Sequence, residues 1–199
     1  MAKVRLTKNE LKSQKDALKR FLRYLPTLIL KKQQLQMEIR RVENGIRDRR
    51  HRIEELLSDF RKWVAVLGED LGLEELVGEL RLVLGAGNIA GIDIPLFREL
   101  AIAGRAYDIF EKPLWVDRAL REIRALLRIE AEILVLEEQR ARLAEELRVT
   151  SQRVNLFEKV KIPETRENIR RIQIYLGDQQ TAAVVRGKIA KNKLVRIEA

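Results

Sequence analysis

The C-terminal part of the chain, from about residue 114 to 193, repeats apolar residues at alternating steps of three and four. The series runs through Leu126, Ile129, Ile133, Leu136, Leu143, Leu147, Val154 and Phe157, with Arg140 and Thr150 at two intervening positions. This period of 3.5 residues places a narrow apolar seam along one side of a helix, which is typical of a coiled coil. A helix of this length spans about 120 Å. It needs a second helix along its seam, because packing supplies most of a long helix's stability.

The N-terminal part of the chain supplies a matching helix. Thr7 and Glu10 form a T-x-x-E capping box that predicts its start. Apolar residues then recur at the same steps, at Leu11, Leu18, Leu22, Leu25, Leu35, Ile39, Val42, Ile46, Ile53, Leu56, Phe60, Val64 and Leu67. Pro26 removes one backbone donor, which predicts a kink or a local break. If the two helices pair antiparallel, the numbers of facing residues sum to about 181.

Residues 68–112 differ from both arms, since they hold seven of the ten glycines. Residues 74–84 could form a short helix. The following segments, NIAGIDIPLF and RELAIAGRAYDIF, are β-branched and predict a small β-hairpin. Pro95 argues against a central strand of a larger sheet, and Pro113 suits the first turn of the second long helix.

The sequence therefore predicts a mainly α fold, a long antiparallel two-helix coiled coil with a small head that contains a β-hairpin. We expect an N-terminal helix over residues 1–67, the head over 68–112 and a C-terminal helix over 113–199. Charged residues make up 35% of the chain and aromatic residues only 5%, which fits long helices better than a thick globular core.

The charge is unevenly distributed along the chain. Residues 1–60 carry 16 basic and 8 acidic side chains, and residues 149–199 carry 11 and 5, whereas the middle is mildly acidic. Antiparallel pairing would bring the two basic ends together. The chain has no cysteine, no signal-like apolar run and no uninterrupted apolar stretch of membrane-spanning length, so we expect a cytoplasmic protein without membrane insertion.

Motifs that carry chemistry are weak or missing. The segment GAGNIAG has the spacing G-x-G-x-x-x-G and precedes a predicted strand, whereas a dinucleotide loop needs a helix N-terminus there, so a turn is the better interpretation. The chain has no P-loop, and a single histidine, His51, cannot assemble a metal site. We expect no catalytic residues, no cofactor and no metal.

An arginine-rich segment, RRVENGIRDRRHR, raises the alternative of nucleic-acid binding. Its arginines also suit the solvated outer face of a coiled coil, and aromatic side chains for base stacking are missing nearby. A basic coiled-coil adaptor for nucleic acid or proteins is therefore the alternative function.

The seam changes character near the C-terminus, where it continues through Ile172, Leu176, Gln179, Ala183, Gly187 and Ala190. Small residues at helical spacing indicate either a thin, fraying helix end or a shaft tip that fits a narrow protein socket. A glycine in a helix interior costs about 1 kcal/mol relative to alanine.

These segments resemble the D subunit of the V-type (V/A-type) rotary ATPases. The resemblance covers most of the chain and is strongest in LTKNELKSQKDALKRFLRYLPTLILKKQQLQ and QRVNLFEKVKIPETRENIRRIQIYLGDQQTAAVVRGKIAKNKL. The Arg153-Val154-Asn155 and Ile162-Pro163 element is its most specific piece, and LGDQQTAAVVRGK resembles the bacterial branch.

The resemblance implies a rotor-shaft subunit without catalytic activity, peripheral to the membrane as part of the ATPase complex. It implies that the helical tip enters a hexamer of alternating catalytic and non-catalytic subunits. It also implies two further partners, the small F subunit of the stalk and the subunit that couples the shaft to the membrane ring. In that role we expect partner contacts from Arg153, Arg170, Arg171, Gln179, Gln180, Arg186 and Lys188.

Overall fold

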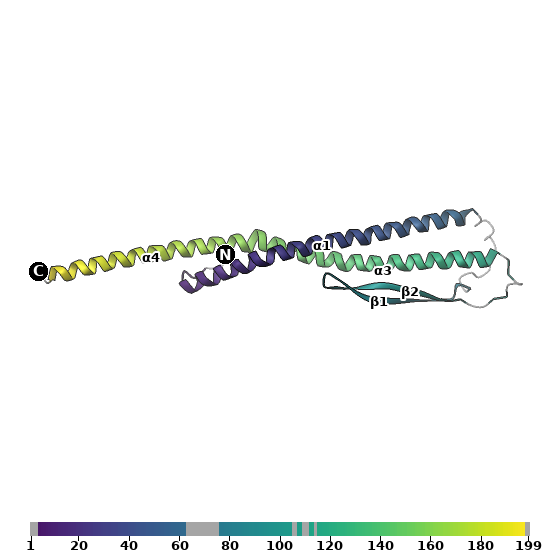
Figure 1. Ribbon diagram of the computed structural model, residues 1–199, viewed down its shortest axis with the longest axis horizontal. Coiled ribbons are helices and arrows are strands. Elements are labelled where there is room, and N and C mark those ends of the chain that lie inside the picture. Colours follow the sequence, from purple (N-terminus) through teal and green to yellow (C-terminus); the bar gives the residue numbers. More distant parts are fainter. Residues whose placement is uncertain (1–3, 63–75, 105–106, 109–111, 114, 198–199) are drawn as a thin grey trace. The chain divides into compact units, whose positions relative to one another are not determined.

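A computed structural model of the chain describes residues 4–62, 76–104, 107–108, 112–113 and 115–197 (Figure 1). Its helices and strands, in chain order, are α1 (Lys8–Arg61), β1 (Glu79–Ile89), β2 (Ile92–Ala103), α3 (Trp115–Asn155), the π-helix η2 (Leu156–Lys161) and α4 (Ile162–Ile197). The chain is 79% helical, and the predicted mainly α fold with two long helical arms and a β-hairpin is confirmed.

The chain divides into two compact units. The first unit comprises Met1–Lys31 and Val149–Ala199, and the second comprises Lys32–Arg148. This division differs from the predicted three-part division at residues 67 and 112, which stays a prediction. Residue 67 itself lies outside the described residues.

In the second unit, α1 and α3 pack antiparallel along the predicted seam. The buried core is formed by Leu35, Val42, Ile46, Ile129, Ile133 and Leu143. An ion pair from Arg49 Nε to Glu132 Oε2, 2.5 Å long, crosses between the two helices. The numbers of these two residues sum to 181, so the predicted register is confirmed here.

A two-stranded antiparallel hairpin, β1 and β2, lies alongside α3 in the same unit (Figure 1). Its turn is Ala90-Gly91, with φ of 53° and 81°. Two such residues make the tight turn that suits the twist of paired strands. The Asn88 side chain accepts a hydrogen bond from the Gly91 amide at 3.0 Å, which fixes the turn.

The predicted limits of the hairpin are wrong. Residues 79–84, expected in a short helix, form the first half of β1, and the turn lies at 90–91 instead of between two later segments. A short leucine-rich run does not separate helix from strand by its period. Residues 79–84 form a strand because they pair with residues 97–103, which lie later in the chain.

The hairpin gives α3 a second buried side. Besides the seam, the side chains of Ala131, Val135 and Gln139 are buried, and Gln139 Nε2 donates to the Pro95 carbonyl of β2 at 2.6 Å. Arg140, which fills a gap in the predicted seam, is exposed instead. A separate apolar cluster of Leu76, Val77, Val116 and Leu120 forms near the base of the hairpin.

In the first unit, the N-terminal part of α1 packs against η2 and α4. The rings of Phe21 and Phe157 lie 5.1 Å apart between centroids and are tilted by 50°. The buried positions on the C-terminal arm of this unit are Thr150, Val154, Ile162, Thr165 and Ile172. Helix α1 continues through Pro26, so the local break that proline can cause does not occur.

The π-helix η2 marks the backbone irregularity that Pro163 imposes on the other arm. The amide of Ile162 donates to the Phe157 carbonyl, five residues back. Pro163 has no amide of its own, and π-turns commonly accompany such an interruption. The Thr165 hydroxyl, two residues after the proline, donates to the Lys161 carbonyl, two residues before it, at 2.6 Å.

Candidate partner-contact surface

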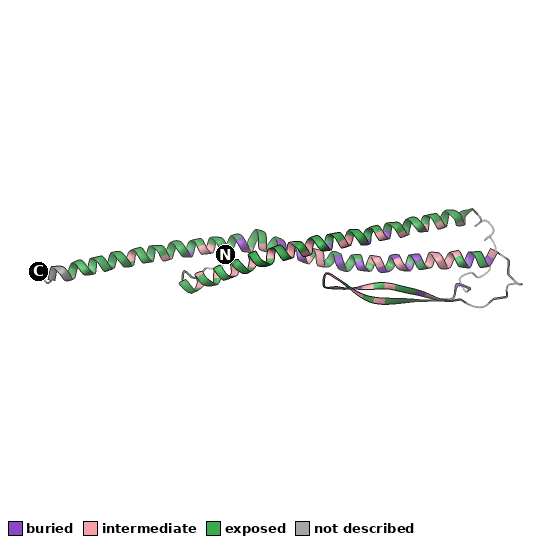
Figure 2. Ribbon diagram, in the orientation of Figure 1, coloured by how far each residue is buried: buried purple, intermediate pink, exposed green. Residues whose placement is uncertain are grey.

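The C-terminal half of α4 extends past the helix that it packs against (Figure 2). Ile172 is completely buried, but from residue 173 to 193, here called the α4 tip, only Leu176 and Ala182 are even partly buried. The reason is geometric. Helix α1 begins at Lys8, and within this unit Phe21 of α1 contacts Phe157, so antiparallel pairing leaves no part of α1 opposite α4 beyond about residue 173.

The predicted seam therefore loses its intramolecular partner within the α4 tip. Gln179, Ala183, Gly187 and Ala190 are all exposed. An added Cβ at either Gly177 or Gly187 would meet nothing within 4 Å. Packing against the described residues therefore does not require these residues to be small.

All seven predicted contact residues are exposed, but they do not form one patch. Arg153 lies in α3, and the other six lie in α4. Successive residues of an α-helix turn by about 100°. Arg170 and Lys188 therefore share one side of the helix, while Gln179 and Arg186 point to the opposite side. Arg171 and Gln180 point to the two flanks, so the set encircles α4.

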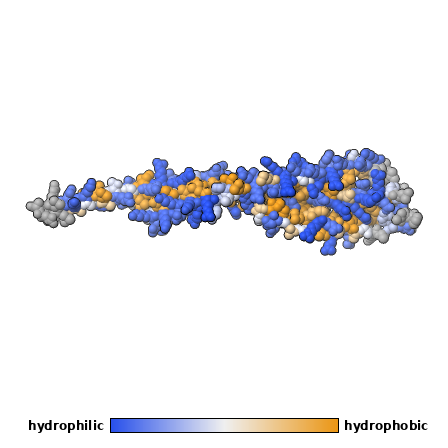
Figure 3. All heavy atoms as spheres, viewed as in Figure 1, coloured by the Kyte–Doolittle hydropathy of each residue, from blue (hydrophilic) through white to orange (hydrophobic). Residues whose placement is uncertain are grey.

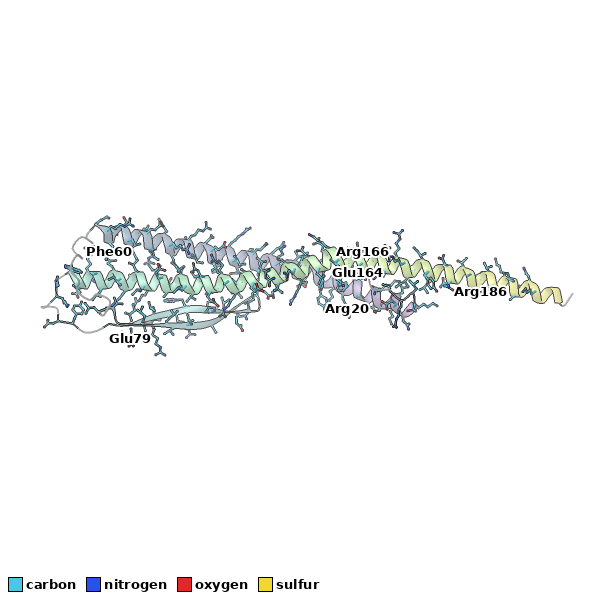
Figure 4. The ribbon with its side chains drawn as sticks, turned by 180° about the vertical axis from the view of Figure 1, so that it is seen from behind. Arg20, Phe60, Glu79, Glu164, Arg166 and Arg186 are labelled. Atoms are coloured by element: carbon cyan, nitrogen blue, oxygen red, sulfur yellow. The ribbon has the colours of Figure 1, made fainter. Side chains whose placement is uncertain are left out.

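The tip is positively charged. It contains Arg186, Lys188, Lys191 and Lys193 against a single acid, Asp178. Nearer the packed end, Arg171 Nε is held 3.0 Å from Glu167 Oε1, one helical turn earlier. No such ion pair is seen for Arg186 or Lys188 among the described side chains, and Arg186 lies on the part of α4 beyond the end of α1 (Figure 4).

Sequence reasoning missed a group of exposed apolar side chains on the tip. Ile174, Val185 and Ile189 are 56%, 50% and 51% exposed. Helical geometry places them roughly opposite the seam. A second apolar stripe outside the heptad positions was the signal that could have identified them.

The glycine-rich segment, His51 and the arginine-rich segment all lie in the second unit. Gly85 and Gly87 of GAGNIAG lie within β1, and an added Cβ would come within 2.8 Å of a β2 side chain, that of Arg98 for Gly85 and that of Leu96 for Gly87. The expected turn is therefore confined to Ala90 and Gly91, and the first two glycines of the segment lie in strand β1 instead. His51 is 73% exposed and lies near Glu54 and Glu55 on the surface of α1.

The arginine-rich segment of α1 makes contacts within its own chain. Arg50 pairs with Glu137 of α3 at 2.8 Å, Arg41 lies 3.9 Å from Glu38, and Arg47 donates to the Asn44 side chain. Within the described residues, no group of three or more potential metal ligands occurs and no helix is long and apolar enough to cross a membrane.

Tyr107, near the base of the hairpin, has a raised pKa. The phenol of Tyr107 donates to the Asp117 carboxylate, and this hydrogen bond, with a smaller contribution from burial, raises the pKa of Tyr107. The pKa of Glu145 is lowered by its hydrogen bond with Arg148 on the exposed side of α3. Both shifts arise from local pairs on or beside a helix surface.

Together, the long paired helices, the packed β-hairpin and the uncovered helix end define a coiled-coil class of protein. Comparisons with known proteins then identify the family. Residues 10–192 match the family model described as the D subunit of ATP synthase. The chain belongs to this family.

Two relatives show the extent of the similarity. The chain is 46% identical over 196 residues to the V-type ATP synthase D subunit of Borreliella burgdorferi, covering 98% of this chain and 97% of the relative. It is 34% identical over 201 residues to the V-type ATP synthase D subunit of Chlamydia abortus, covering 97% and 94%. The resemblance seen in the sequence is confirmed, including its bacterial character.

Proposed function

We propose that this chain is the central-stalk subunit of a V-type ATP synthase, a rotor shaft that transmits torque between the nucleotide-binding hexamer and the ion-translocating ring in the membrane. The observation that carries the proposal is the uncovered α4 tip, in a chain that belongs to the D-subunit family. A helix end with exposed apolar side chains and no partner within the described chain gains stability by entering another protein.

The composition of the tip supports a contact that changes during a cycle. Glycine and alanine at Gly177, Ala183, Gly187 and Ala190 present few large knobs, so the helix meets a surrounding wall without interlocking with it. Its basic side chains favour acidic groups on that wall. Solvated charge pairs are individually weak, about 0 to 1 kcal/mol, and are therefore exchanged easily.

The arrangement of the contact residues also suits a shaft. Arg170, Arg171, Gln179, Gln180, Arg186 and Lys188 point in all directions around α4, so a ring of subunits would meet a polar group at every orientation. Arg153 extends this set towards η2. In this proposal the tip contacts the alternating catalytic and non-catalytic subunits, while other parts of the chain contact the small F subunit of the stalk and the subunit that couples to the ring.

The chain itself contributes no reaction chemistry in this role. ATP binds and reacts in the hexamer, and the shaft binds neither cofactor nor nucleic acid. Its place is on the cytoplasmic side, peripheral to the membrane as part of the complex.

Charge neutralisation tests the proposal. The double variant Arg186→Gln/Lys188→Gln removes two charges from opposite sides of the tip. We expect a changed ATP hydrolysis rate and weaker coupling of hydrolysis to ion transport. The matched control is Arg40→Gln/Arg41→Gln, two exposed basic residues of α1. Equal hydrolysis and coupling in the wild-type complex and in both variants would contradict the role of these residues.

A further inference from the structure

The seam of the C-terminal arm contains a step of five residues, from Phe157 to Ile162. Before this step, Thr150 and Val154 are buried four residues apart. After it, Ile162 and Thr165 are buried three residues apart, so the heptad steps hold on both sides. In an unbroken α-helix five residues turn by about 500°, which would point Phe157 and Ile162 about 140° apart.

The π-helix η2 brings both residues back to the same side. Its bonds join residues five apart, and the Ile162 amide donates to the Phe157 carbonyl. Phe157 contacts Phe21 of α1, and Ile162 is only 6% exposed. An α-helix without the extra residue would instead turn Lys161 and Glu164 towards the seam, where charged side chains are costly to bury. The extra residue in η2 is therefore also required by the seam.

The backbone ladder is weakened on both helices of this unit. Neither Pro26 of α1 nor Pro163 of α4 has an amide to donate to the carbonyl four residues back. Beside Pro26, the Thr27 hydroxyl donates to the Tyr24 carbonyl at 2.8 Å, a local bond of the kind that competes with the helix's own bonds. Because the helices are antiparallel, the two prolines lie on opposite sides of the contact between the two phenylalanine rings.

Side-chain packing is thin around this ring contact. Among the described residues, none of α1 in this unit is buried, and none of η2 is buried. Leu22, Leu156 and Val160 are 45%, 45% and 48% exposed. Hydrophobic atoms are accordingly visible on the surface along this part of the molecule in Figure 3. A helix pair with few buried apolar contacts and an incomplete backbone ladder has low local stability.

We propose that residues 21–27 of α1 and 156–163 of the C-terminal arm, here called the joint, allow the two helices to bend and twist together. Val154 on one side of the joint and Thr165 and Ile172 on the other stay packed while η2 changes its winding. The end of the chain that carries the α4 tip then turns slightly without slipping along the seam. The inference rests on the proposed function only for the use of this motion, which lets the hexamer and the ring turn slightly out of step.

Single-residue deletions in the isolated chain test the role of the extra residue. Deletion of Val160 leaves a step of four between Phe157 and Ile162, which an α-helix accommodates. We expect this variant to melt no lower than the wild-type chain, with the amides of η2 exchanging about tenfold more slowly. The control is deletion of Gln152, an exposed residue before η2, which turns the following seam residues by about 100° and should lower the melting temperature. Equal losses of melting temperature for the two deletions, or unchanged exchange in η2, would overturn the proposal.

Stiffening the joint in the assembled ATP synthase tests its motion. Pro26→Ala gives α1 the missing amide, and deletion of Val160 removes the π-turn. The control is Gly45→Ala, which also favours the helix but lies outside the joint, where its methyl group would make ordinary contacts at 3.5 and 3.7 Å. With the hexamer fixed and a probe on the ring end of the shaft, we expect a narrower angular fluctuation of the probe in both joint variants than in the wild type or the control.

Unchanged fluctuation in the joint variants, or equal narrowing in the control, would overturn the joint. The shaft proposal would survive either result if ATP hydrolysis still turned the probe, and it would fail if the probe did not turn in the wild-type complex.

Discussion

Arg49 Nε donates to Glu132 Oε2 at 2.5 Å, and this bond joins α1 to α3 at residues whose numbers sum to 181. Arg49 also donates to the Gly45 carbonyl of its own helix at 3.2 Å. The guanidinium is thus fixed from two directions, and the pair marks the register of the two helices in the second unit.

A double-mutant cycle on Arg49→Gln and Glu132→Gln should give a coupling free energy of about 0.5 to 1 kcal/mol. The side chains are only 37% and 29% exposed, so solvent screens the pair incompletely. The comparison is the Arg50 and Glu137 pair, 61% and 35% exposed, which should couple less. Urea denaturation of the four-member cycles measures both. Stronger coupling in the more exposed pair would contradict the expected order.

Leu143→Ala should destabilise the second unit by about 2 to 5 kcal/mol, because Leu143 is completely buried in the seam and its truncation leaves a cavity. Leu134→Ala, on the same helix but at a side chain 62% exposed, should change the stability by less than about 0.5 kcal/mol. Chemical unfolding followed by circular dichroism measures both values. Similar losses for the two variants would show that the seam does not organise this helix.

Gln139→Leu should loosen the hairpin while the seam stays intact. The substitution removes the donor to the Pro95 carbonyl and leaves that acceptor unsatisfied, at a cost of about 1 to 3 kcal/mol. Amide exchange in β1 and β2 should accelerate, but exchange in the paired part of α1 should not. The control is Arg140→Ala, at the neighbouring exposed position, which should change the amide exchange of neither the hairpin nor α1. If both variants gave the same exchange rates, Gln139 would not be the residue that anchors the hairpin.

High pH should destabilise the wild-type chain more than Tyr107→Phe. The hydrogen bond to Asp117 raises the pKa of Tyr107 in the folded state, so its stabilisation is present below the pKa of the unfolded chain and is lost as pH rises through the folded value. The window therefore begins at about pH 10 and extends upward. Unfolding free energies across this range measure the difference, and parallel pH profiles for the two proteins would exclude the linkage.

Gly187→Ala should raise the stability of the isolated chain by up to about 1 kcal/mol, since alanine is the better helix former and nothing lies within 4 Å of the added methyl group. In the complex, the same methyl group should slow ATP-driven turnover if the tip fits a narrow socket. Thermal unfolding and steady-state hydrolysis separate the two effects. Higher stability together with unaltered turnover would argue against a close fit at this position.

Local periodicity predicted the helices well and the hairpin poorly. The step of three and four located the buried Ile129, Ile133 and Leu143, because a coiled-coil seam is encoded within a few turns of each residue. The strand character of residues 79–84 depends on pairing with residues 97–103, and the burial of Gln139 depends on the hairpin arriving beside α3. Neither relationship has a local signal.

The contact surface was predicted in part. The exposure of Arg186 and Lys188 follows from the position of Lys8, where the partner helix begins, and this limit could be read from the capping box at Thr7 and Glu10. The arrangement of the contact residues around the whole circumference of α4 needed the helix geometry.

The most direct test of the shaft proposal is a cross-link from the α4 tip in the working complex. The chain has no cysteine, so Arg186→Cys introduces a single thiol, and Arg41→Cys in α1 is the control. The proposal predicts that oxidation forms disulfides between position 186 and cysteines placed in both alternating subunits of the hexamer, and that these cross-links stop ATP hydrolysis. Reduction of the disulfides should restore ATP hydrolysis. A complete cross-link at position 186 with undiminished hydrolysis, or links that form only from position 41, would contradict it.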